Sequence, residues 1–123
     1  AHPKEAESIM SLNPSYVFFK ERKGKEGAIG SQGVPLTAER SLAVDPTYVP
    51  LGTVMWVDIK HPDPKIAPLQ RLMVSQDTGG AIKGGIRGDF FWGFGDKAEK
   101  FAGIMKSPGQ YFLLLPRKEG CSL

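Results

Sequence analysis

The chain has 123 residues, of which 41% are hydrophobic and 24% charged, a composition typical of one globular domain, or part of one, that can bury a core. Its net charge of +3 is mild, and the cations between residues 20 and 25 are interleaved with glutamates, so we predict a solvated loop there and no nucleic-acid partner. Cys121 is the only cysteine, which excludes an internal disulfide, and His2 and His61 lack neighbours at zinc-ligand spacing, so we predict no metal and no cofactor.

The first third of the chain predicts a short helix, a strand and a loop. Residues 3–12 have a helical pattern, and Pro14 ends it by restricting the residue before it to extended conformations. Residues 16–19, Tyr-Val-Phe-Phe, are typical of a buried strand. Residues 24–33 are rich in glycine and charge and predict a loop. Because the chain opens like the tail of a helix, we expect residues 1–12 to end a preceding segment of a longer product.

The middle of the chain predicts three strands separated by turns. Residues 41–44, 54–59 and 71–76 are short apolar runs. Between them lie a turn at 50–53 and a connection at 61–68 with three prolines. The glycine-rich residues 78–85 predict a flexible turn.

A helix and a final strand are predicted near the end of the chain. Asp96 can cap a helix with Glu99 three positions on, as in a capping box. The apolar face of this helix consists of Ala98, Phe101, Ala102 and Met105. Pro108 and Gly109 end the helix, and residues 111–115 predict a buried strand. Several short strands with one or two short helices indicate a small, mainly β barrel.

Three aspartates lie in apolar or glycine-rich surroundings. Asp45 follows one predicted strand, Asp77 ends another, and Asp89 lies in the segment Arg-Gly-Asp-Phe-Phe-Trp at residues 87–92. An aspartate that ends an apolar run is expected to be partly buried, which raises the carboxyl pKa, and a nearby carboxylate raises it further. A carboxyl group that stays protonated near neutral pH can act as an acid catalyst.

One of the three aspartates also begins a protease-like tripeptide. The run Asp-Thr-Gly at residues 77–79 is the local signature of aspartic proteases, in which two such aspartates share a proton. The chain contains it once, so a protease would have to be a homodimer. The following Gly-Ala-Ile-Lys-Gly departs from the retroviral pattern. The protease is therefore the weakest of the alternatives.

Taken together, these segments resemble the three-aspartate (3D) domain, the C-terminal portion of membrane-bound lytic murein transglycosylase A. The resemblance covers residues 11–117, in order and with family-like spacing. The segments that carry it are Asn-Pro-Ser-Tyr-Val-Phe-Phe at 13–19, Val-Pro-Leu-Thr at 34–37, Val-Asp-Pro at 44–46, Pro-Leu-Gly-Thr at 50–53, Arg-Leu-Met-Val at 71–74, Gln-Asp-Thr-Gly-Gly-Ala-Ile-Lys-Gly at 76–84, Arg-Gly-Asp-Phe-Phe-Trp-Gly at 87–93 and Tyr-Phe-Leu-Leu-Leu-Pro at 111–116.

The resemblance implies a fold and a division of the chain. The family fold is a six-stranded double-psi β-barrel, which we expect at residues 13–117, followed by a C-terminal tail at 118–123. In the family a separate domain is inserted into the barrel, so an N-terminal portion of the same protein is expected to complete it. That portion would be a separate chain or a cleaved piece; the alternative is that this chain is a shortened homologue. The resemblance also implies a periplasmic location and an outer-membrane anchor that lies outside this chain.

The implied activity is cleavage of the β-1,4 bond between N-acetylmuramic acid and N-acetylglucosamine in peptidoglycan, with release of 1,6-anhydromuramic ends. Asp89 matches the acid/base aspartate, Asp77 its hydrogen-bonded partner, and Asp45 the third, supporting aspartate. The chemistry is consistent, because one carboxyl suffices when the attacking group is the C6 hydroxyl of the sugar itself. Asp77 would keep the pKa of Asp89 high by like-charge repulsion, and the two would titrate as a pair. Asp45, before Pro46, has turn capping as an equal alternative.

Six further residues are candidates for binding the glycan strand. Each has a plain structural alternative. The backbone at Gly79 and Gly80 could admit a sugar or only form a turn, Lys83 and Arg87 could bind a lactyl or stem-peptide carboxylate or be solvated, and Trp92 could stack on a pyranose ring or pack in the core. The sixth candidate is Thr78, beside Asp77.

A non-catalytic function is the main alternative. Expansin-like and barwin-like double-psi barrels bind cell-wall glycans without necessarily cleaving them. Loss of half of the sugar groove would favour such a binding module, whereas the three aspartates in family context favour an enzyme.

Overall fold

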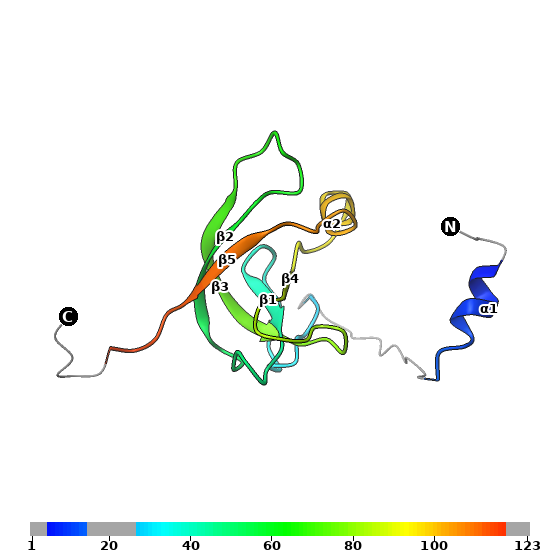
Figure 1. The fold of residues 1–123 in the computed structure, drawn as a ribbon, viewed down its shortest axis with the longest axis horizontal. Coiled ribbons are helices and arrows are strands. Elements are labelled where there is room, and N and C mark those ends of the chain that lie inside the picture. The colour runs from blue at the N-terminus through cyan, green and yellow to red at the C-terminus, as the bar shows by residue number, and fades with distance from the viewer. Residues whose placement is uncertain (1–4, 15–26, 118–123) are drawn as a thin grey trace.

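The computed structural model describes residues 5–14 and 27–117. In these ranges the chain forms five strands and two short helices (Figure 1). They are α1 (Ala6–Met10), β1 (Ser41–Val44), β2 (Val54–Ile59), β3 (Leu69–Asp77), β4 (Gly88–Phe90), α2 (Asp96–Ala102) and β5 (Gly109–Leu113).

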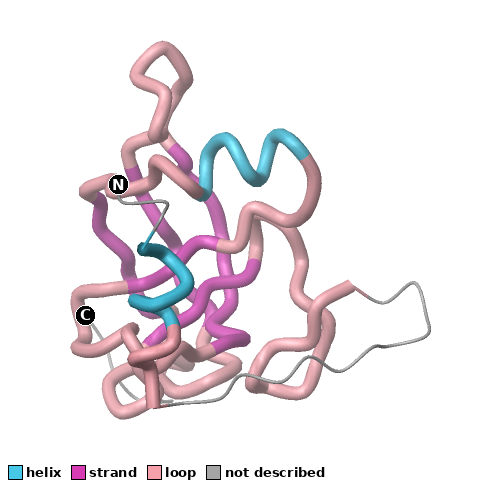
Figure 2. The backbone as a smooth tube through the Cα atoms, turned by 90° about the vertical axis from the view of Figure 1, so that its right-hand side faces the viewer, coloured by secondary structure: helices cyan, strands magenta, loops and turns pink. Residues whose placement is uncertain are grey.

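The five strands form one curled sheet (Figure 2). Their order in the sheet is β4-β1-β3-β2-β5. β1 runs parallel to β3, and the other neighbouring pairs are antiparallel. The described part of the chain is thus mainly β, as predicted, but its sheet has five strands instead of six. The strand predicted at residues 16–19 lies outside the described residues.

Alternation along β2 places one face of the sheet in the core. Met55 and Val57 have no exposed surface, whereas Val54 and Trp56 on the other face are 39% and 40% exposed. This period of two is what a strand with one buried face requires. The inward residues of the sheet and its turns form the main core cluster, which consists of Leu42, Val44, Val49, Met55, Val57 and Met73.

A second cluster holds the segment that follows β4 against the sheet. It contains Leu69 from β3, Trp92, and Ala98 and Phe101 from α2. Because the rings of Trp92 and Phe101 lie 5.2 Å apart, α2 anchors the residues directly after Asp89. The site strand β4 is therefore held on one side by β1 and beyond its end by this cluster.

The predicted helix is present and begins at Asp96, but it is capped differently and ends earlier. Gly95 occupies the N-cap position with φ of 83°, and no side chain caps the helix. The predicted capping box is therefore wrong: Asp96 is the first helical residue, where its charge still favours the positive end of the helix dipole. The helix ends at Ala102, which is exposed, and only part of the predicted apolar face is buried.

The strand predictions differ in outcome. The strands at 41–44 and 54–59 are confirmed with their bounds, and the one at 71–76 lies inside β3. The prediction of a buried final strand is wrong, because β5 is an edge strand and Phe112 and Leu113 are 54% and 38% exposed. The short strand β4 was not predicted.

Candidate active site

The sheet register brings two of the three aspartates to one cavity. Ala43 in β1 pairs with Asp77 of β3 on one side and with Asp89 of β4 on the other. Since neighbouring strands lie about 4.8 Å apart, the two aspartate backbones are about 10 Å apart. Both aspartates line a cavity of about 260 Å³, together with Thr78 and Phe91.

Asp77 is hydrogen-bonded to a loop far away in the sequence. Its Oδ1 accepts hydrogen bonds from the backbone N–H of Ser31 at 2.9 Å and from the Ser31 hydroxyl at 3.0 Å. The same hydroxyl lies 2.7 Å from the Thr78 hydroxyl oxygen. Sequence reasoning did not find Ser31, because it lies 46 residues from Asp77 in a loop without a distinctive pattern.

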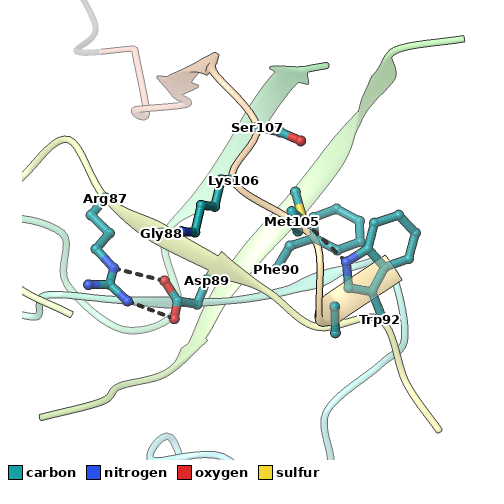
Figure 3. Close-up of a pocket in the computed structure, with 9 residues that line it drawn as sticks. Arg87, Gly88, Asp89, Phe90, Trp92, Met105, Lys106 and Ser107 are labelled. Carbon is teal, nitrogen blue, oxygen red and sulfur yellow. Dashed lines mark hydrogen bonds and ion pairs between the residues drawn. The ribbon is translucent and has the colours of Figure 1, made fainter. Parts of the chain in front are cut away.

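Asp89 forms a bidentate ion pair with Arg87 (Figure 3). The Arg87 Nε and Nη2 atoms donate to the two carboxylate oxygens at 3.0 and 3.2 Å, and Nη1 donates to the Ala81 carbonyl at 2.9 Å. The hydrogen bonds and charge of Asp89 raise the pKa of the Arg87 guanidinium. Both side chains are half exposed. In the described residues no hydrogen bond joins Asp77 to Asp89, so the predicted hydrogen-bonded partnership is not present in this structure.

A second, larger cavity of about 550 Å³ lies on the other side of Asp89. It is lined by Arg87, Gly88, Asp89, Phe90, Trp92, Ala102, Met105, Lys106 and Ser107. Asp89 therefore borders two cavities, one shared with Asp77 and one shared with two cations. Sequence reasoning did not single out Lys106, whose place in the site depends on how the chain returns from α2.

Asp45 anchors the glycine-rich turn instead of lining either cavity. It is 6% exposed, and its two carboxylate oxygens accept backbone hydrogen bonds from Thr47 at 3.0 Å and Gly84 at 2.9 Å. The hydrogen bond from Gly84 and then those from Thr47 lower the pKa of Asp45, and the charge of Lys83 adds to this. The expected rise of its pKa is therefore wrong, because N–H donors that favour the ionised form outweigh burial.

Asp45 thus has the turn role that the sequence left open, because its carboxylate fixes the backbone of Gly84 beside it. The positive charge of Lys83 acts on Asp45, whereas Arg87 forms an ion pair with Asp89. The structure therefore separates the two cations that the sequence grouped.

The two glycines after Asp77 differ in the space around them. A Cβ atom at Gly79 would lie 2.9 Å from the Ile82 Cδ1 atom, whereas one at Gly80 would have no atom within 4 Å. A side chain at Gly79 would therefore displace the end of the Ile82 side chain, while the backbone at Gly80 is open to a ligand.

Trp92 belongs to the core. It is 6% exposed, and the rings of Phe90, Phe101 and His61 lie 4.7, 5.2 and 5.5 Å from its own ring. These neighbours cover the indole, so the core-packing alternative describes it, and stacking on a pyranose ring does not fit. Only part of its edge reaches the larger cavity.

The described residues hold neither a metal-ligand cluster nor a helix that could span a membrane. Residues 5–14 and 27–117 contain no group of three or more histidine, cysteine, aspartate or glutamate side chains that could hold a metal ion. In the same ranges, neither helix has the length and hydrophobicity needed to span a bilayer.

Comparison with known families identifies the class. The 3D domain model matches residues 40–115, which include all three aspartates, so the chain belongs to the 3D domain family. More particularly, it is homologous over about nine tenths of its length to the 3D domain of membrane-bound lytic murein transglycosylase A.

Three relatives give the extent of this similarity. The chain is 36% identical over 115 residues to a membrane-bound lytic murein transglycosylase A homolog of Buchnera aphidicola, covering 90% of this chain and 31% of the relative. It is 47% identical to the lytic transglycosylase LtgG of Burkholderia pseudomallei, with a TM-score of 0.74, covering 95% of this chain and 35% of that one. For the membrane-bound lytic murein transglycosylase of Agrobacterium tumefaciens, the identity is 38%, the TM-score 0.81, and the coverage 94% and 32%. The chain thus spans about a third of the length of these relatives.

Proposed function

We propose that this chain carries the acid/base centre of a peptidoglycan lytic transglycosylase. The observation that supports this most is the place of Asp89, half exposed on the edge strand β4, where it lines both cavities and is separated from Asp77 on β3 by the single strand β1. A catalytic acid must reach a glycosidic oxygen from a groove, and this position allows it.

The proposed reaction uses one carboxyl twice. Protonated Asp89 donates its proton to the glycosidic oxygen, and the bond between that oxygen and C1 of N-acetylmuramic acid breaks. The resulting carboxylate then takes the proton from the C6 hydroxyl, whose oxygen forms the new bond to C1. The product is a 1,6-anhydro ring, no water is consumed, and Asp89 is protonated again. Proximity within one sugar takes the place of a second carboxylate.

Asp77 would act without touching the reacting proton. Its Oδ1 atom is held by two donors from Ser31, and it faces the cavity that it shares with Asp89. Such a fixed negative charge would stabilise the oxocarbenium-like transition state that glycoside cleavage passes through. Thr78 and the open backbone at Gly80 would contact the sugar on the same side.

The finer points of fold and location are part of the proposal. The edges β4 and β5 are not paired with each other in the described sheet, and an N-terminal portion of the same protein would close it into the six-stranded double-psi barrel. We propose a periplasmic location with anchorage at the outer membrane, since relatives of this chain are named as membrane-bound enzymes.

A glycan-binding module without activity is the second candidate. The observation that favours it is the ion pair in which Arg87 holds both carboxylate oxygens of Asp89, whereas a catalytic acid must have an oxygen free to reach the glycosidic bond. The homodimeric protease has no comparable support, because the Asp-Thr-Gly run occurs once and its second aspartate would have to come from another copy of the chain.

A release assay on purified peptidoglycan separates these candidates. We expect the chain, alone or together with its N-terminal portion, to release soluble fragments, and Asp89→Asn to bind the polymer without releasing them. Binding without release by the unchanged chain in both forms would favour the binding module.

A further inference from the structure

We propose that the 550 Å³ cavity is a receptor for a carboxylate on the peptide substituent of the glycan, with Arg87 and Lys106 as its binding residues. This inference rests on the proposed function and adds a substrate class to it, namely glycan strands that still carry their stem peptides. It differs from the role of Asp89 in the reaction, because the site recognises a group that does not react.

The residues that line the cavity have an excess of positive charge. Its ionisable residues are Arg87, Lys106 and Asp89, so two cations face one carboxylate. Lys106 is exposed and forms no hydrogen bond or ion pair with any residue in 5–14 or 27–117. Figure 3 shows its side chain extending from the segment after α2 toward Gly88 and the ion pair. The cavity therefore has one positive charge more than its own residues neutralise.

The ion pair leaves some N–H donors of Arg87 available for a second carboxylate. Arg87 uses three hydrogen bonds to hold Asp89 and the Ala81 carbonyl, and a guanidinium has further N–H donors on its outer edge. Planar bidentate pairing with carboxylates is the geometry that arginine favours. A second carboxylate in the cavity would therefore meet Arg87 donors together with the ammonium of Lys106.

The arriving carboxylate would compete with Asp89 for Arg87. The charged groups that surround Asp89 are Arg87 on its own segment, Lys106 after α2, and Asp77 at the end of β3, while its β1 neighbour Ala43 carries no charge. A carboxylate held by Arg87 and Lys106 would then lie directly beside the proposed acid, because Asp89 lines the same cavity. Binding of the peptide would thus position the strand next to Asp89.

The remaining walls of the cavity suit a peptide stem. Phe90, Met105 and the edge of Trp92 form an apolar side opposite the cations. Muramic acid carries its peptide as an amide on the lactyl group, so aliphatic and amide portions separate the sugar from the first free carboxylate. An apolar wall that leads to two cations matches this order of groups.

The test compares one substrate in two forms. Glycan strands with intact peptides and the same strands after amidase treatment are digested by the unchanged chain, by Lys106→Gln and by Lys65→Gln, with the N-terminal portion added if the release assay requires it. Lys65 is an exposed lysine outside both cavities and serves as the matched control. We expect the unchanged chain and Lys65→Gln to cleave peptide-bearing strands about tenfold faster, the scale of one charge-assisted hydrogen bond. In Lys106→Gln the ratio should approach one through a loss on peptide-bearing strands alone.

The outcomes separate this inference from the proposed function. Equal rates of anhydro-product formation on both strand types would overturn the inference and leave the transglycosylase proposal standing. Absence of anhydro products from either strand would instead count against the proposed function. In that case NMR titration with N-acetylmuramyl dipeptide decides the inference: shifts at the Lys106 and Arg87 side chains, absent with N-acetylglucosamine, support it, and their absence refutes it.

Discussion

Replacing Gly88 by alanine tests whether β1 sets the position of the proposed acid. A Cβ atom at Gly88 would lie 2.8 Å from the Leu42 Cδ2 atom and 3.1 Å from its Cγ atom, compared with about 3.5–4.0 Å for an ordinary carbon contact. The two groups must therefore separate by about 0.7–1.2 Å. Leu42 is 2% exposed in the main core, whereas β4 is a three-residue edge strand, so β4 is the element that moves.

The expected losses of stability and of rate follow from this displacement of β4. Overpacking of this kind costs about 1–3 kcal/mol, and the melting temperature should fall by roughly 5–15 °C. Asp89 is the next residue and pairs with Ala43, so it shifts with the strand. A misplacement of about 1 Å in a reacting group can cost roughly 100-fold in rate. We therefore expect a loss of rate larger than the loss of stability explains.

Calorimetry and the release assay measure the two effects, and Gly80→Ala is the control for stability alone. No atom lies within 4 Å of a Cβ atom at Gly80, so its stability should change by less than about 0.5 kcal/mol. Leu42→Val removes the atom at 2.8 Å, and in that background Gly88→Ala should cost about 1 kcal/mol less. Strictly additive costs, or a Gly88→Ala variant as stable and active as the parent, would refute the reasoning.

Three further predictions concern an ion network, an anchor and an aromatic surface. The hydrogen bond from Lys97, with that from Arg71, lowers the pKa of Glu39 below its ordinary 4.5. Glu39→Gln should therefore cost about 1 kcal/mol of unfolding free energy at pH 7, and progressively less as the pH falls through the lowered pKa. Urea unfolding at several pH values measures this. Asp45→Asn should speed hydrogen exchange of the Gly84 amide, because an amide side chain is a weaker acceptor than the carboxylate that holds it at 2.9 Å; unchanged exchange would contradict the anchoring role. Phe94 is 70% exposed and lines a hollow that shares Phe91 with the smaller cavity. Phe94→Ala should therefore weaken the binding of a chitin hexamer several-fold, as measured by calorimetry. An equally large effect of Phe112→Ala, at a side chain that is 54% exposed, would show that the loss is not specific.

Local pattern predicts the strands that are short apolar runs. The run Val-Met-Trp-Val in β2 predicts a strand, but all four residues are apolar, so only the structure shows which of them are buried and which exposed. The strand β4 has only Gly-Asp-Phe, which contains no apolar run to recognise. It is a strand because β1 offers it a free edge, and such pairing depends on the assembled sheet.

The site was predictable in its aspartates but not in their partners. The segments around Asp77 and Asp89 pointed to acid chemistry, and the register through Ala43 brings them to one cavity. The contacts of Ser31 and Lys106 join segments far apart in the chain, so no local motif reveals them.

The pKa shift of Asp45 was unpredictable for the same reason, because its sign depends on contacts that only the fold creates. Burial could be argued from an apolar run, but the N–H donors of Thr47 and Gly84 are supplied by the folded turn. A sequence argument that counts only burial therefore predicts a shift of the wrong sign.

The most direct test of the account is mass spectrometry of the products released from purified peptidoglycan. The chain is assayed alone and with its N-terminal portion, beside the Asp89→Asn variant under the same conditions. The account predicts 1,6-anhydromuropeptides, each lighter by one water than the hydrolysis product, and none from the variant. Products with reducing ends, or anhydro products that persist in Asp89→Asn, would contradict a single-carboxyl reaction at Asp89.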